Sequence, residues 1–193
     1  MKKASICLVF SIMLLVIPAG CDVNQTIETL SPDQVQALNE EETYSEIMGE
    51  LFITYTERED IVNDATDIVR VHLQSSEVKS LGGYPQTHSF LKVEETLKGN
   101  LQAGETIEVI EEGGIGDYLL GDLPPIRADN DYLLHLKESD GVYYVVGAYQ
   151  GRFIIRNGYV FQQGTVDAKL QTYTPQPVEL FTDEVEEIVR SVD

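Results

Sequence analysis

The stretch "DYLLHLKESDGVYYVVGAYQGRFIIRNGYVF", residues Asp131 to Phe161, predicts a meander of neighbouring strands. Ser139-Asp140-Gly141 is a turn signal, and Asn157-Gly158 is the strongest kind of short hairpin signal. The segments between these turns are rich in β-branched and aromatic residues, which favour strands. We therefore expect a mainly β fold, with strands at 132–137, 142–148 and 152–155.

The preceding part of the chain continues this pattern. Residues 61–78 predict a short helical turn and then a strand with a period of two. In this strand one face carries Ile68, Arg70 and His72, and the other carries Val69, Val71 and Leu73. Residues 80–86 read as a loop, residues 87–100 as an alternating strand that ends at Lys98-Gly99-Asn100, and residues 105–112 as a strand with Ile107 and Val109 on one face.

Helical patterns flank the strands. Ser31 can cap a helix that runs from Pro32 into the Tyr44–Met48 region. At the other end, Thr182 can cap a final helix whose apolar face contains Val185, Ile188, Val189 and Val192. No internal repeat is evident, so we expect residues 31–193 to form a single β-barrel-like domain with flanking helices.

The N-terminal stretch "MKKASICLVFSIMLLVIPAGC" has lysines, then an apolar run from Ile6 to Ile17, then small residues before Cys21. This order is typical of a secretory signal, and the run is shorter than the roughly 20 residues that span a bilayer. Ala19-Gly20-Cys21 resembles the lipobox of bacterial lipoproteins, although Pro18 stands where a branched aliphatic residue is usual.

The lipobox resemblance implies that residues 1–20 are a lipoprotein signal peptide and that Cys21 is the lipid attachment site. Residues 21–30 would be a flexible tether, and the domain would lie at the extracytoplasmic face of the cell membrane. The alternatives are ordinary cleavage that leaves a free Cys21, or an uncleaved anchor. If Cys21 is acylated, no cysteine pair remains for a disulfide, and the domain must fold on its apolar core alone.

The formal net charge of the chain is −20. A charge of this sign repels the phosphates of nucleic acid and the headgroups of anionic lipid, so we expect neither as a direct partner. The acidic excess favours solubility and is interpreted mainly as a solvated surface. Attraction of cations or basic partners is the other interpretation.

The series "ATDIVRVHL", "FLKVEETLKGN", "GETIEVIEEGG", "DNDYLLHLK" and "VYYVVGAYQGRFII" resembles a group of uncharacterised extracytoplasmic lipoproteins, mostly of Gram-positive bacteria. Its order of strands also resembles the netrin/tissue-inhibitor type of OB barrel, over about Ala65 to Tyr159. The resemblance implies a small OB-like antiparallel barrel of five or six strands. Netrin-like domains carry disulfides and often act through an N-terminal cysteine, so no inhibitory activity is carried over.

Residues with catalytic or metal-binding chemistry are not arranged in known motifs. His72, His88 and His135 lack metal-ligand spacing, and there is no GxSxG sequence. We therefore predict no catalytic, cofactor-binding or metal-binding residue. The acidic pairs Glu94-Glu95, Glu111-Glu112 and Glu186-Glu187 are interpreted as solvated faces.

The stretch "EEGGIGDYLLGD", residues 111–122, combines glycines with acidic side chains. It contains no lysine or arginine, so a phosphate cradle is excluded. Calcium binding stays open as a minor alternative, because hard cations take carboxylate oxygens although the usual calcium-loop spacing is absent. Otherwise this is an acidic loop that serves as a contact surface.

These observations lead to a functional hypothesis. The leading one is a membrane-anchored extracytoplasmic lipoprotein that acts as a binding or interaction module, is not an enzyme, and meets an unknown protein or cell-envelope partner. The alternatives are a cell-envelope enzyme, or an accessory subunit of one, with a site not visible in the sequence, and a purely structural envelope component.

Overall fold

The computed structural model describes residues 55–82, 84–113, 126–162 and 175–192. The predicted signal peptide, Cys21, the tether, the helix from Pro32 and most of the 111–122 stretch lie outside these residues. The described elements are, in order, α2 (Arg58–Asp64), β1 (Asp67–Leu81), β2 (Tyr84–Lys98), β3 (Thr106–Glu112), β4 (Asp131–Ser139), β5 (Val142–Val145), the 3₁₀ turn η1 (Ala148–Gly151), β6 (Arg152–Arg156), β7 (Tyr159–Gln162), β8 (Gln176–Pro177) and α3 (Val178–Val192).

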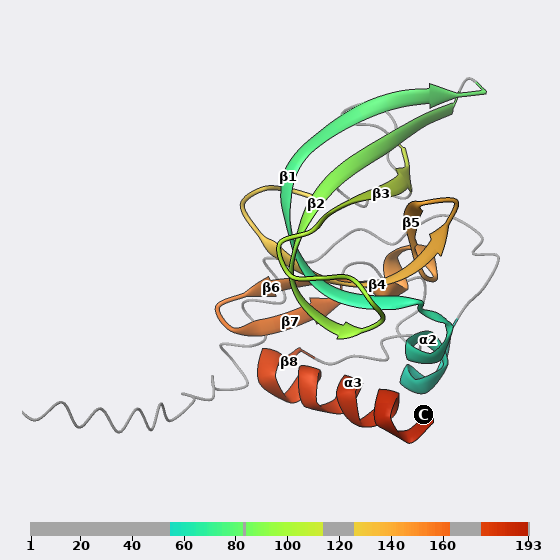
Figure 1. Ribbon diagram of the computed structural model, residues 1–193. Helices are drawn as coiled ribbons and strands as arrows, with labels where there is room; N and C mark the ends of the chain where they lie inside the picture. The colour runs from blue at the N-terminus through green and yellow to red at the C-terminus, as the bar shows by residue number, and fades with distance from the viewer. Residues whose placement is uncertain (1–54, 83, 114–125, 163–174, 193) are drawn as a thin grey trace, which may run out of the picture.

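Five of the strands close into a barrel (Figure 1). Around the ring β1 pairs with β2, β2 with β3, β3 with β5, β5 with β4, and β4 again with β1. The β3–β5 pair is parallel, with Val109 opposite Tyr143, and the other pairs of the ring are antiparallel. This is the strand order of an OB barrel. The predicted fold class, a mainly β OB-like barrel with a C-terminal helix, is confirmed.

The β1–β2 ribbon bends because its register slips at three places. Ile68 pairs with Lys98 but Val69 with Thr96, so Leu97 is an extra residue on β2. The other two extra residues are Glu94 on β2 and Gln74 on β1. Bulges of this kind bend a strand and increase its twist. The bending lets β1 pair with β2 along one edge and with β4 along the other, as the curved ribbon in Figure 1 shows.

Apolar side chains of alternate residues fill the barrel. Fully buried members of this interior cluster are Val71 on β1, Val93 on β2, Val109 on β3 and Leu134 on β4. The face of β1 that the sequence predicts as apolar is therefore the inner face. Burial of each such side chain contributes about 1.5–3 kcal/mol to the stability of the fold.

A second apolar cluster lies outside the barrel, beneath the two helices. Ile68, Leu133 and Phe153 come from the outer surface of the strands, and Phe181 and Val185 come from α3. In Figure 1 α3 runs along one side of the sheet with α2 near its C-terminal end. The helices thus cover part of the outer face of β1 and β4, and the rest of that face stays open.

The "LKGN" sequence at the end of β2 contacts both β1 and α2. Gly99 has a φ of +94°, and a Cβ at this position would lie 2.0 Å from Oδ1 of Asp67. That oxygen accepts a hydrogen bond from the backbone N–H of Asn100 at 3.1 Å. The ammonium group of Lys98 donates to the carbonyl of Val62 at 2.8 Å, near the end of α2. A glycine is required here because both the backbone angle and the space exclude a side chain.

The strand predicted at 142–148 is shorter than expected, because β5 ends at Val145. Ala148 has a φ of +52°, which is incompatible with a strand, and it begins the η1 turn. The side-chain amide of Gln150 then binds the backbone of Tyr55 twice, accepting from its N–H at 3.0 Å and donating to its carbonyl at 2.8 Å. A long-range contact therefore stabilises the turn where local propensity predicts a strand.

Two other predicted boundaries also move. The loop predicted at 80–86 is only a turn, because β1 continues to Leu81 and β2 starts at Tyr84. The final helix begins at Val178 rather than after Thr182. The backbone N–H of Val178 donates to the carbonyl of Gly158 at 2.9 Å, so the β6–β7 hairpin satisfies a group that a side-chain cap would otherwise serve.

Candidate functional site

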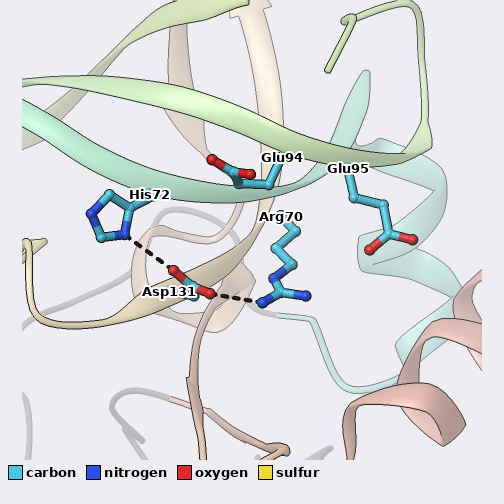
Figure 2. Close-up of a pocket in the computed structure, with 5 residues that line it drawn as sticks. All are labelled: Arg70, His72, Glu94, Glu95 and Asp131. Carbon is cyan, nitrogen blue, oxygen red and sulfur yellow. Dashed lines mark hydrogen bonds and ion pairs between the residues drawn. The ribbon is translucent and has the colours of Figure 1, made fainter. Parts of the chain in front are cut away.

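The open part of the outer face of β1 and β4 carries a polar cluster (Figure 2). Register places His72 opposite Asp131 and Arg70 opposite Leu133. Nη2 of Arg70 lies 2.7 Å from Oδ2 of Asp131, and Nδ1 of His72 lies 3.1 Å from Oδ1. Each carboxylate oxygen of Asp131 therefore has its own cationic or hydrogen-bonding partner from β1.

Two adjacent glutamates of β2 line the same depression. Arg70 pairs with Glu95 while Val71 pairs with Val93, so Glu94 is the bulged residue between them. Successive residues of a regular strand point to opposite faces, but a bulge changes the direction of a side chain. With Arg70, His72 and Asp131, both glutamates surround a depression of about 600 Å³. In Figure 2 Asp131 and Glu95 appear on opposite sides of the Arg70 side chain.

A second depression, of about 570 Å³, shares His72 and Asp131 with the first. It continues past Asn130 to the β6–β7 hairpin, where Arg156 and Asn157 line it. Nε of Arg156 donates to Oδ1 of Asn130 at 3.0 Å, which holds this wall in place. The two depressions together form one polar surface, which we call the β1–β4 groove.

The electrostatics of the groove keep Asp131 ionised. Burial by itself would raise the pKa of this carboxyl group, but the hydrogen bonds and charges of Arg70 and His72 outweigh burial and lower the pKa below its usual value. A carboxylate bonded to Nδ1 orients a histidine ring and favours the tautomer whose proton is on that nitrogen. Asp131 therefore positions the side chains of both Arg70 and His72 on β1.

The groove is shallow and polar. Arg70, His72 and Asp131 are 36%, 42% and 34% exposed. The described residues that line the two depressions include no serine, threonine, cysteine, tyrosine or other aromatic ring besides the imidazole of His72. No group of three or more potential metal ligands occurs within the described part of the chain. The arrangement can bind polar groups, but these described lining residues present no hydroxyl or thiol nucleophile.

The three histidines lie in three different environments. Only His72 is in the groove. His88 lies on β2 with Nδ1 2.6 Å from Oε1 of Glu108. His135 is fully buried under α3, against Phe153.

The three acidic pairs also separate. Glu94 and Glu95 line the groove, whereas Glu186 and Glu187 are exposed on α3. Glu111 forms an ion pair at 2.9 Å with Arg152, which is almost fully buried. One pair of the three is therefore part of the candidate site, where Glu94 and Glu95 are exposed to solvent and lie beside Arg70 and His72.

The comparisons with known proteins add no family. No protein-family model matches the chain, and no curated protein is significantly similar to it. Within the ranges that the structure describes, no helix is long and apolar enough to cross a membrane. The β1–β4 groove on this OB-like barrel is the feature that indicates a function.

Proposed function

We propose that this chain is a lipid-anchored extracytoplasmic binding protein and that its ligand docks in the β1–β4 groove. The lipobox-like sequence that ends at Cys21 supports the anchor. Acyl chains contribute about 0.8 kcal/mol per buried methylene, so two or more chains would hold the domain at the membrane. The strong acidic charge would keep the barrel itself away from anionic headgroups.

The bulge at Glu94 is the observation that carries the binding assignment. A regular strand would direct Glu94 and Glu95 to opposite faces, and here both line one depression with Arg70, His72 and Asp131. Bulges are over-represented where a protein re-aims a side chain for a task. The bulge at Glu94 therefore both bends β2 in the barrel and brings Glu94 and Glu95 to the same site.

Charge indicates the kind of ligand. Asp131 is neutralised locally by Arg70. Within the described ranges Glu94 pairs only with the exposed Lys92, at 3.1 Å. The carboxylate of Glu95 has no hydrogen-bond or ion-pair partner among the described residues. These two glutamates leave the rim of the groove negative, so the ligand should present an ammonium or guanidinium group.

A comparison of two glutamate pairs tests this proposal. The full-length chain is crosslinked in its native envelope, purified, and its partners are identified. We expect Glu94→Gln combined with Glu95→Gln to reduce the yield of a specific crosslinked partner at least tenfold. Glu186→Gln combined with Glu187→Gln makes the same change of charge on α3 and should leave the yield unchanged. Equal losses in both variants, or no loss in the first, would contradict the assignment of the groove.

One observation favours a second function. The hydrogen bond from His72 to Asp131 resembles the base and orienting carboxylate of hydrolytic enzymes. For that function His72 would activate a water molecule, since no hydroxyl or thiol group is among the described lining residues. Incubation with chromogenic esters, phosphates and glycosides separates the two. Turnover that disappears in His72→Gln would establish an enzyme, and no turnover is expected for the binding protein.

A further inference from the structure

His135 on β4 points out of the barrel into the apolar cluster beneath α3. Its side chain is fully buried, with its ring centre 5.3 Å from that of Phe153 and 6.4 Å from that of Phe181. Among the residues that the structure describes, neither ring nitrogen has a hydrogen-bond partner. A buried polar group without a partner costs free energy, and a charged one costs far more.

The charged groups nearest His135 are cations, and both of them disfavour its protonation. α2 contributes Arg58, which pairs with Glu184 of α3, and β2 contributes Lys98. β1 and β6 contribute the uncharged side chains of Ile68 and Phe153. Burial, and then the charges of Arg58 and Lys98, lower the pKa of His135 to about 3. The backbone of Gly151 raises the pKa of His135, which offsets this lowering only in part. Its position relative to the ring does not have the geometry of a hydrogen bond.

The position of this histidine confines the effect to one layer of the molecule. His135 touches the outer cluster, which α3 closes with Phe181 and Val185. The interior of the barrel is a separate cluster made by the opposite face of β4, with Leu134 and Leu136. Removal of α3 therefore exposes His135 to water while the interior cluster keeps its contacts.

We propose that His135 makes the docking of α3 acid-sensitive, so that acidification releases α3 from a barrel that stays folded. Ile68, Leu133 and Phe153 would then be exposed on the outer face. Asp131 and His135 lie on the same face of β4, so the newly exposed surface adjoins the β1–β4 groove. This inference does not depend on the proposed function.

The direction of the pH effect follows from proton binding. A released His135 has an ordinary pKa near 6.5, and the docked residue stays neutral down to about pH 3. Only the released form binds the proton in this window, so docking is unaffected above pH 6.5 and weakens as the pH falls below it. Each pH unit multiplies the ratio of released to docked α3 by about ten, which gives about a hundredfold change between pH 7 and pH 4.5.

Amide hydrogen exchange of the intact chain tests the proposal. Protection factors, corrected for the intrinsic rate at each pH, are measured for α3 and for β1–β4 at pH 7 and pH 4.5. We expect α3 to lose about a hundredfold in protection while the barrel strands lose much less. His135→Phe keeps an aromatic ring of similar size and should remove the loss, and His135→Leu serves if the phenylalanine variant does not fold.

Two controls make the outcome decisive. His72→Gln changes a half-exposed histidine in the groove and should respond to acid like the unchanged chain. Glu184→Gln removes the partner of Arg58, and it should also retain the pH dependence. The proposal is overturned if α3 stays protected at pH 4.5, if helix and barrel lose protection together, or if His135→Phe responds as before.

Discussion

At the scale of single residues, a few positions have environments that no neighbour in sequence specifies. Gly99 adopts a left-handed backbone beside Asp67, and His135 is a neutral ring in an apolar layer. Both occur in stretches that read as ordinary strand and turn. The turn at Lys98-Gly99-Asn100 was predicted from residue type, whereas the need for glycine comes from the carboxylate of Asp67, distant in sequence.

Gly99→Ala should destabilise the fold by about 3 kcal/mol or more, because the new Cβ meets Asp67 and the backbone is strained. Gly104→Ala is the matched control. Its φ is also positive, at +90°, but open space surrounds it, so we expect only about 1 kcal/mol. Urea unfolding of the two variants measures both losses. Equal losses would show that the contact with Asp67 does not matter.

At the scale of elements, the local sequence pattern sets the buried face of a strand, and long-range contacts set where some strands and helices begin or end. The alternation of Val69, Val71 and Leu73 correctly predicted the inner face of β1, since one buried face imposes a period of two. The end of β5 was mispredicted because Gln150 binds the backbone of Tyr55, far away in the chain. The start of α3 was mispredicted for a similar reason, since its first N–H is satisfied by Gly158.

The α3 helix should depend on one aromatic side chain for its docking. Phe181 is fully buried, and its ring centre lies 5.0 Å from that of Phe153. Phe181→Ala should lower the free energy of unfolding by about 3–5 kcal/mol. Leu180→Ala alters the adjacent position, which is 53% exposed, and should cost less than about 0.5 kcal/mol. Thermal or urea unfolding gives both values, and a large loss for Leu180→Ala would indicate a different orientation of the helix.

At the scale of the whole molecule, the barrel closes through contacts that are distant in sequence. β1 pairs with β4, and β3 meets β5 in parallel at Val109 and Tyr143. The same closure brings Asp131 to Arg70 and His72. The barrel and the groove are therefore consequences of one topology.

The proposed anchor also belongs to this scale. Cys21→Ala should abolish acylation and either release the chain into the soluble fraction or block its maturation. Cell fractionation and the mass of the mature N-terminus measure the two effects. Cys7→Ala is the control, because this cysteine lies in the predicted signal peptide and should be dispensable. Unchanged membrane retention of the Cys21 variant, with no lipid on the unaltered chain, would refute the lipoprotein proposal.

The candidate site was only partly visible in the sequence. The period of two places Arg70 and His72 together on one face of a strand, and Glu94-Glu95 is evident as an acidic pair. Their common position was missed because a strict period of two separates adjacent residues. A one-residue bulge has no local signature here, since it depends on how β2 pairs with β1.

By itself the sequence determined the mainly β class and the approximate positions of most strands, because side-chain alternation and turn preferences act between near neighbours in the chain. The tertiary structure alone decided the bulge at Glu94, the burial of His135 and the meeting of Arg70, His72 and Asp131. Each of these depends on which strand lies beside which, and that choice is made by burial and pairing across the whole barrel.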